Sequence, residues 1–161
     1  MHRQVSHSLR TALSGALIVC VMTAAFSCAT APPVQTEEDV RAVTALAAAG
    51  KTDILSRQSH LPFLFDGEIL VRSQDVSEMW RLTAAADLFG ANPAVAGLSD
   101  TGPETYKLFA ESKQVQLFFS KYAGEHARIA VIDTPNARVT LLLDGKSEGY
   151  SRIAGMKVDV R

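Results

Sequence analysis

The sequence predicts an α+β fold, in which N-terminal helices pack on an antiparallel sheet that ends in a three-stranded meander. Two observations support this prediction. Apolar residues recur mostly at helical spacing between residues 36 and 124, whereas residues 127–160 alternate between apolar and polar positions. Short connections separate the three alternating segments, and strands joined so closely must pair antiparallel.

Length and composition indicate one folded domain behind a leader. Of the 161 residues, 47% are hydrophobic and 20% charged, and the first 27 have the features of a segment that is removed. The remaining 134 residues suffice for one domain but not for two. Without Arg3 and Arg10 they include 14 basic and 17 acidic residues, and this net charge of −3 argues against binding to nucleic acid. Cys20 and Cys28 both precede the folded part, which excludes a disulfide or a cysteine-ligated metal within the domain.

Residues 1–27 have the pattern of a secretory signal, because two arginines precede the uncharged apolar run 12–26 and small residues follow it. As a helix this run would span about 22 Å, short of the roughly 30 Å hydrocarbon core of a bilayer. Its end, Ala25-Phe26-Ser27-Cys28, resembles the bacterial lipobox, in which the cysteine becomes the first mature residue and carries the lipid.

This resemblance implies a lipoprotein that is acylated at Cys28, for instance with palmitate, and held on the bilayer by about 0.8 kcal/mol per buried methylene. Ala29 follows the cysteine where inner-membrane lipoproteins of Gram-negative bacteria have Asp, which implies the outer membrane, with the domain facing the periplasm. The alternatives are a plain cleaved signal ending near Ala31 and an uncleaved anchor. Residues 28–36 would form the lipidated cysteine and an extended tether, and residues 37–161 the single domain.

The first helix of the domain is expected to begin after Thr36. A hydroxyl N-cap followed by three acidic residues stabilises the positive end of a helix, and apolar residues then recur at helical spacing. Gly50 predicts the C-terminal cap of this helix. A second, shorter helix is expected over residues 53–59, with Ile54 and Leu55 facing inward.

Residues 61–71 predict a short strand or hairpin. Pro62 stops any helix there, and apolar residues flank Asp66-Gly67, a dipeptide typical of tight turns. The stretch Asp75-Val76-Ser77-Glu78 matches the capping box, so a helix should begin at that point. Its apolar stripe would consist of Val76, Met79, Trp80, Thr83 and Ala86, and would shift towards Leu88 at its end.

The remaining chain is expected to contain a loop, a helix and the meander. Four helix-breaking residues predict a loop over 90–102, and Pro103 predicts the first position of a helix that continues to Gly124. The strands of the meander are expected over 127–133, 138–144 and 148–160, with a bulge at Gly155. The core face of this meander would be formed by Ile129, Val131, Val139, Leu141 and Leu143.

An order of helices, an early strand, a further helix and a meander is similar to the nuclear-transport-factor-like superfamily, which includes ketosteroid isomerases and polyketide cyclases. The residues that carry this resemblance are Pro62 to Leu70, the helix around Trp80 and the run 148–156. The resemblance covers residues 37–158 and implies a curved, cone-like sheet that encloses a cavity with its helices. The sequence departs from the family at Ser151, where the closing strand has an aromatic residue, and at 103–124, where many members have a strand.

Four titratable residues, His60, Asp66, Glu68 and Asp75, cluster in sequence beside aromatic residues. One interpretation is a carboxylate whose pKa is raised by an apolar cavity, which could transfer a proton as in an isomerase or dehydratase. The other is structural: Asp66 stabilises a turn, Asp75 caps a helix and Glu68 faces solvent. Local sequence alone accounts for the structural roles, so this interpretation is favoured.

We therefore predict no catalytic residue. His60 and His126 lack the spacing of metal ligands, and no nucleotide-binding or hydrolase motif occurs, so neither a metal nor a cofactor is expected. The candidate pocket or core residues are Phe63, Phe65, Asp66, Trp80, Tyr106 and Tyr150.

Three functions follow from these observations. The first, which is favoured, is a non-catalytic envelope lipoprotein whose domain binds a small apolar ligand or an envelope protein. The second is an isomerase- or dehydratase-like enzyme with an acid in its cavity. The third is a structural or assembly component that uses its sheet face, which an exposed flat apolar face would favour.

Overall fold

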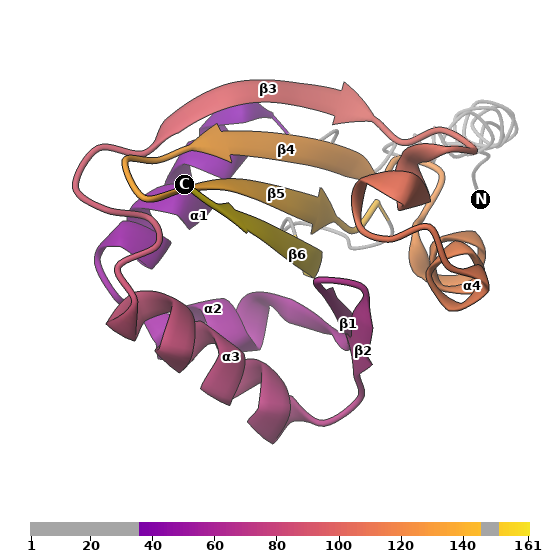
Figure 1. The fold of residues 1–161 in the computed structure, drawn as a ribbon, viewed down its shortest axis with the longest axis horizontal. Coiled ribbons are helices and arrows are strands. Elements are labelled where there is room, and N and C mark those ends of the chain that lie inside the picture. The colour runs from indigo at the N-terminus through magenta and orange to yellow at the C-terminus, as the bar shows by residue number, and fades with distance from the viewer. Residues whose placement is uncertain (1–35, 146–151) are drawn as a thin grey trace, which may run out of the picture. The chain divides into compact units, whose positions relative to one another are not determined.

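We describe a computed structural model of the chain, which covers residues 36–145 and 152–161 (Figure 1). All described residues belong to one compact unit. Cys28, Tyr150 and the start of the strand expected over 148–160 lie outside the described residues.

The described residues form helices and one six-stranded sheet, in the order β2-β1-β6-β5-β4-β3. The strands are β1 (Ser59–Phe65), β2 (Glu68–Leu70), β3 (Ala94–Asp100), β4 (Arg128–Asp133), β5 (Ala137–Leu143) and β6 (Ile153–Val160). The helices are α1 (Glu37–Ala48), α2 (Thr52–Gln58), α3 (Ser73–Ala85) and α4 (Lys113–Tyr122), with a short 3₁₀ helix η1 (Thr105–Leu108). This confirms the α+β class and the C-terminal meander of β4, β5 and β6. Neighbouring strands pair antiparallel except β1 and β6, which run parallel.

The first helix begins and ends as its sequence predicts. The Thr36 hydroxyl accepts a hydrogen bond from the Asp39 amide, and the Asp39 carboxylate accepts one from the Thr36 amide, which completes a capping box. At the other end Gly50 has a φ of 63°, and the amides of Gly50 and Lys51 donate to the carbonyls of Ala47 and Leu46. This is the Schellman arrangement, which satisfies carbonyls that the end of a helix leaves free.

The hairpin expected over residues 61–71 is present as β1 and β2, and it turns at Asp66-Gly67. Both turn residues have positive φ, 45° and 89°, the combination that suits the twist of a two-residue hairpin. A methyl group at Gly67 would lie 2.9 Å from the Cβ of Ala110, so this position also needs glycine for space.

The prediction that a helix begins at Asp75 is wrong. Helix α3 begins at Ser73, with Arg72 as an N-cap that has no side-chain hydrogen bond. The Asp75 amide already donates to the Arg72 carbonyl, and the Asp75 carboxylate accepts from the Arg72 guanidinium at 2.7 Å. Glu78, which should complete the capping box, pairs with Arg81 instead, so local ion pairs replace the predicted cap.

The apolar stripe of α3 is buried at Val76, Met79, Trp80 and Thr83, but the last predicted member, Ala86, is exposed. The helix ends at Ala85, so its periodicity no longer applies beyond that residue. Leu88 is half-buried against the core as expected, and Phe89 is buried beside it.

The expected loop over 90–102 contains a strand, β3, which pairs antiparallel with β4. Alanine and glycine are poor strand formers, so Ala94 to Asp100 shows no strand pattern by itself. The pairing that makes it a strand is with residues 128–133, about thirty positions away in the chain, and a local pattern cannot show it.

The single helix expected from Pro103 to Gly124 is also wrong, because η1 and α4 replace it. The chain breaks between them, and Ser112 becomes the N-cap of α4 by accepting a hydrogen bond from the Val115 amide. The break allows Phe109 and Phe119 to pack together, with ring centroids 5.6 Å apart.

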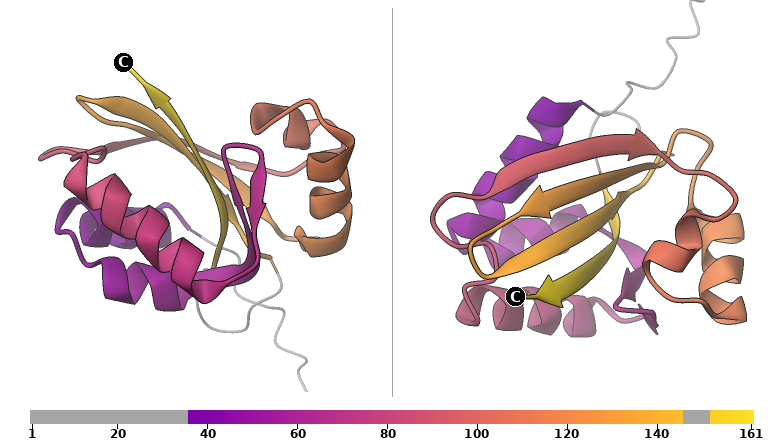
Figure 2. Two further views of the ribbon diagram at one scale, coloured as in Figure 1. Left: turned by 60° about the horizontal axis from the view of Figure 1, so that its bottom comes forward. Right: turned by 45° about the horizontal axis from the view of Figure 1, so that its top comes forward.

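Both faces of the sheet are buried over much of their area, as Figure 2 shows: α1, α2 and α3 lie on one side and α4 with η1 on the other. The five residues predicted to share one core face therefore separate. Val139, Leu141 and Leu143 face the first three helices, whereas Ile129 and Val131 face α4. The register of β5 and β6 shifts between Leu142 and Leu143, beside Gly155, as expected for a bulge there.

Candidate functional site

Phe63 and Trp80, two of the candidate pocket residues, belong to the core rather than to a pocket. Trp80 is 1% exposed, its indole N–H donates to the Ser59 hydroxyl at 2.9 Å, and its ring lies 6.4 Å from that of Phe63. Phe65, on the same face of β1, is half-buried against this core. These residues hold α3 on the sheet.

Asp66 is exposed in the hairpin turn, where its carboxylate accepts a hydrogen bond from the Val158 amide at 2.9 Å. Partial burial raises the pKa of Asp66 above its ordinary value, the hydrogen bond from Val158 opposes this, and the charge of Asp159 raises it further. The carboxylate thus links the turn to the last strand across 92 residues of sequence, as a structural role requires.

The other titratable candidates do not form a cluster around Asp66, although the charge of Glu68 adds to the raised pKa of that carboxyl. Glu68 is exposed in β2, and Asp75 pairs with Arg72 at the start of α3. The His60 ring lies 6.3 Å from the ring of Tyr122 in α4. Its buried Nδ1 has no hydrogen-bond partner in the structure. Within residues 36–145 and 152–161, no group of three His, Cys, Asp or Glu side chains could hold a metal ion.

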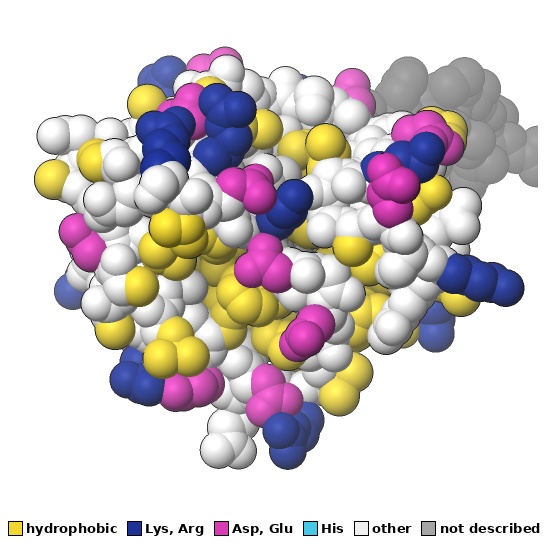
Figure 3. Space-filling model, in the orientation of Figure 1, with side chains coloured by type: hydrophobic (Ala, Val, Ile, Leu, Met, Phe, Trp, Pro, Cys, Tyr) yellow, Lys and Arg dark blue, Asp and Glu magenta, His cyan; other side chains and the backbone are white. Residues whose placement is uncertain are grey.

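Charges on the surface are mixed rather than separated. Figure 3 shows Lys and Arg beside Asp and Glu, with hydrophobic side chains gathered towards the middle of this face. Many of these charges form ion pairs between neighbouring turns of one helix, such as Arg41 with Glu37 and Arg57 with Asp53. Exposed pairs of this kind contribute little stability, roughly 0.3–0.5 kcal/mol each.

Tyr106, named above as a pocket or core residue, lines a hollow on the surface. A hollow of about 300 Å³ lies between the segment after β3 and helix α4, and it has two aromatic walls, Tyr106 and Phe119. Gln116 and Ser120 add polar groups to its rim. A second hollow of about 500 Å³ between α2 and α3 is lined almost entirely by polar and charged side chains.

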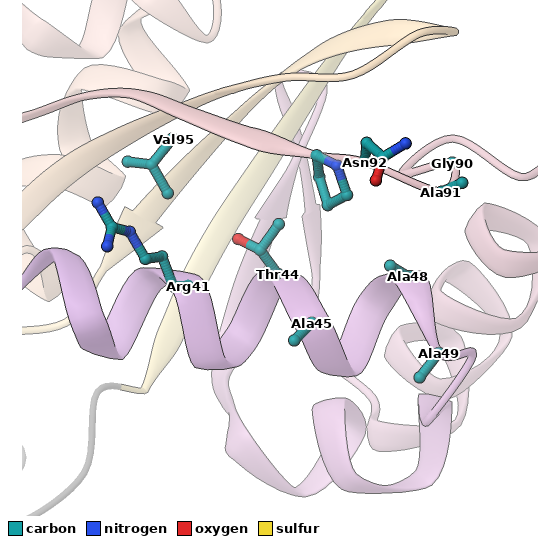
Figure 4. A pocket seen from close by; sticks show the side chains of 10 residues that line it. Arg41, Thr44, Ala45, Ala48, Ala49, Gly90, Ala91, Asn92 and Val95 are labelled. Carbon is teal, nitrogen blue, oxygen red and sulfur yellow. The ribbon is translucent and has the colours of Figure 1, made fainter.

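A third hollow, a groove of about 540 Å³ with several alanines in its floor, lies between helix α1 and the beginning of β3 (Figure 4). Its lining residues are Arg41, Thr44, Ala45, Ala48, Ala49, Gly90, Ala91, Asn92, Pro93 and Val95. Figure 4 shows α1 and β3 running side by side, with Arg41 near one end of the groove and Asn92 near the other. The groove is wide because the floor residues are small, and its polar groups lie at its ends.

The groove was not predicted because one of its walls includes the beginning of a strand that sequence reasoning missed. In the sequence, Thr44 for example is only one position of a helix. In the structure it lines the groove, while its hydroxyl donates a hydrogen bond to the Val40 carbonyl. A run of exposed alanines on one side of α1 is a weak signal that could have indicated a hollow there.

Comparison with protein-family models, with curated proteins and with solved structures finds no match to this chain. No helix among the described residues is both long enough and apolar enough to cross a membrane. The fold and the groove are therefore the basis for any statement about function.

Proposed function

We propose that the protein is an envelope lipoprotein, anchored in the outer membrane through acylated Cys28, whose domain binds a ligand or partner without catalysing a reaction. The observation that carries the binding role is the groove between α1 and β3, a hollow of about 540 Å³ with an apolar floor and polar ends. The anchoring role rests on the signal-like leader and on the lipobox-like residues that end at Cys28.

The geometry of the domain supports a tethered module. Helix α1 starts at Glu37, so only a few residues separate the acylated cysteine from the folded part. A tether of this length keeps the domain close to the bilayer surface, where an envelope partner or a small apolar ligand would be met. The same order of helices, hairpin, helix and strands supports the resemblance to the nuclear-transport-factor-like superfamily, which is part of this proposal.

An isomerase- or dehydratase-like activity has less support. Such an enzyme needs an acid inside an apolar cavity, whereas Asp66 is exposed and its carboxylate accepts a hydrogen bond from the Val158 backbone. The pKa of Asp66 is raised, but its carboxylate already has a structural partner in the Val158 amide.

Metabolic labelling with palmitate tests the anchor. The full chain and its Cys20→Ser variant should both incorporate label and sediment with outer-membrane vesicles. Cys28→Ser should lose the label and accumulate as an uncleaved precursor. Labelling that persists in Cys28→Ser, or that disappears in Cys20→Ser, would contradict the proposed anchor.

Native mass spectrometry of the protein released from membranes tests the binding role. Ala45→Trp fills the groove, whereas Ala42→Trp adds the same side chain to an exposed position of α1 outside the groove lining. A co-purifying ligand or partner should be lost from Ala45→Trp and kept by Ala42→Trp. Equal retention by both variants would place the binding elsewhere.

A further inference from the structure

We propose that the groove between α1 and β3 takes an extended peptide segment, which adds to the free edge of β3 and places apolar side chains over α1. This inference rests on the proposed binding function and specifies its partner. The partner segment has alternating apolar side chains and one carboxylate, which meets Arg41.

The first observation is that β3 is the outermost strand on its side of the sheet (Figure 1). Among the residues that the structure describes, no backbone group from another segment hydrogen-bonds the outer side of Ala94 to Asp100. Proteins usually protect such an edge with Lys, Pro, a bulge or an inward-pointing charge; β3 has a bulge at Ala96 and Asp100 at its far end, but no Lys or Pro among its seven residues. The edge is therefore able to pair with another strand.

The two edges of the sheet differ in this respect. The opposite edge strand, β2, has three residues and begins with Glu68, so it offers little backbone for pairing. Strand β3 has seven residues, and its exposed side chains include Ala94, Ala96 and Ser99, which are small and would not hinder an incoming strand. Strand addition is thus favoured at the β3 edge.

The second observation is that the groove lies directly beside this edge. Residues 90–93 and Val95 of β3 form one wall and helix α1 forms the other, and Figure 4 shows α1 and β3 running side by side there. A peptide paired with β3 would direct every second side chain towards α1. Because Ala45, Ala48 and Ala49 are small, larger apolar side chains of the peptide have room there.

The third observation concerns charge. Arg41 is the only charged residue in the groove lining, and its side chain is 70% exposed. It pairs with Glu37, which is exposed to a similar degree. Because such an exposed ion pair is weak, a peptide carboxylate could take the place of Glu37 beside Arg41. Charge complementarity therefore favours an acidic residue or a free C-terminus in the bound segment.

A peptide fits this site better than an acyl chain or a second copy. An acyl chain would cover the unpaired amides and carbonyls of β3 without satisfying them, which is costly. In a second copy, Val95 and Leu98 of its own β3 already pack on its core, so they could not fill the groove. The register of β3 also shifts at Ala96, which bends this edge and opposes pairing with another bulged strand.

The experiment uses the full chain, immobilised in detergent, and a random dodecapeptide phage library as the probe. Selected peptides should be rich in alternating apolar residues with at least one Asp or Glu. As synthetic peptides they should bind the wild type and Ala42→Trp alike, and Ala45→Trp roughly tenfold or more weakly. Selection on Arg41→Glu should return peptides with Lys or Arg in place of the acidic residue.

Amide hydrogen exchange shows whether the peptide pairs as a strand. Exchange at Ala94 to Asp100 should slow when a selected peptide binds, while exchange in β2 should not change. The proposal is overturned if no peptide is enriched, if Ala45→Trp binds as tightly as Ala42→Trp, or if β3 exchange is unaffected.

A final arm distinguishes a second copy as the occupant. The outcome that contradicts the peptide is a dimer of the full chain that Gly97→Lys dissociates without disturbing the fold. In that case another β3 occupies the edge and the peptide proposal is wrong. Gly97 suits this test because a side chain there meets no atom within 4 Å. Palmitate labelling at Cys28 is independent of all these results, so failure here leaves the proposed anchor intact.

Discussion

Replacing Trp80 by alanine should remove a large part of the stability of the domain. The Trp80 side chain is 1% exposed, contacts the rings of Phe63 and Phe89 with centroids 6.4 and 6.5 Å away, and donates one hydrogen bond to Ser59. Truncations of this kind cost about 3–5 kcal/mol, because the surrounding residues only partly fill the space. The Ser59 hydroxyl keeps its own bond to the Leu55 carbonyl, so no buried donor is left unpaired.

The expected loss is large compared with the total. A domain of this size has a free energy of unfolding of about 6–19 kcal/mol, so Trp80→Ala would remove a quarter or more of it in most of this range. The melting temperature should fall by roughly 10–25 °C. Trp80→Phe, which keeps an aromatic ring but loses the hydrogen bond, should cost much less, about 1–2 kcal/mol.

The assay is urea unfolding followed by far-ultraviolet circular dichroism. Fluorescence is unsuitable because Trp80 is the only tryptophan in the chain. Leu82→Ala is the matched control, since Leu82 lies on the same helix but is 53% exposed, and its loss should change the unfolding free energy by less than about 0.5 kcal/mol. Equal effects of Trp80→Ala and Leu82→Ala would refute the assignment of Trp80 to the core.

Three further outcomes are expected. A chain of residues 35–161 should unfold cooperatively, with the same midpoint with and without dithiothreitol, because it contains no cysteine; a gradual transition would show that the domain boundary is misplaced. Asp66→Asn should lower the unfolding free energy only slightly. Relative to wild type the variant should gain stability as the pH rises from 3 to 7, because a group with a raised pKa stabilises the fold more when it is protonated. A difference between the two unfolding free energies that does not change with pH would contradict the raised pKa. Gly155→Ala should cost about 1–3 kcal/mol, because the added methyl group would lie 2.9 Å from the Leu64 carbonyl oxygen, whereas Gly97→Ala, in open space, should not destabilise, and calorimetry of the two variants compares them directly.

The sequence predicted those elements whose hydrogen bonds connect residues close together in the chain. The cap of α1 involves Thr36 and Asp39, and the hairpin turn involves Asp66 and Gly67, so a few residues contain the whole signal. The meander was predictable because its alternating strands are joined by short turns. The capping box at Asp75 shows the limit of this reasoning: the two carboxylates that the motif requires pair instead with Arg72 and Arg81, each three residues away, and a motif alone does not decide between competing local partners.

Of the candidate site residues, the sequence placed Trp80 in the core and Asp66 in a turn, and it left Tyr106 open between a pocket and the core. It could not indicate the groove. Arg41 and Ala45 look like ordinary exposed positions of a helix, and they become walls of a site only because β3 lies beside them.

By itself, then, the sequence determined the helix caps, the hairpin turn and the alternating strands, because each depends on backbone conformations and hydrogen bonds within a few residues. Tertiary structure alone decided three other features: the strand at Ala94 to Asp100, the break between η1 and α4, and the parallel pairing of β1 with β6. The two strand pairings satisfy backbone groups through contacts between residues far apart in the chain, and the break between η1 and α4 buries Phe109 against Phe119. Such contacts override weak local preferences. Leaving a buried amide unpaired, or a cluster of phenylalanines exposed, costs more free energy than placing alanine and glycine in a strand.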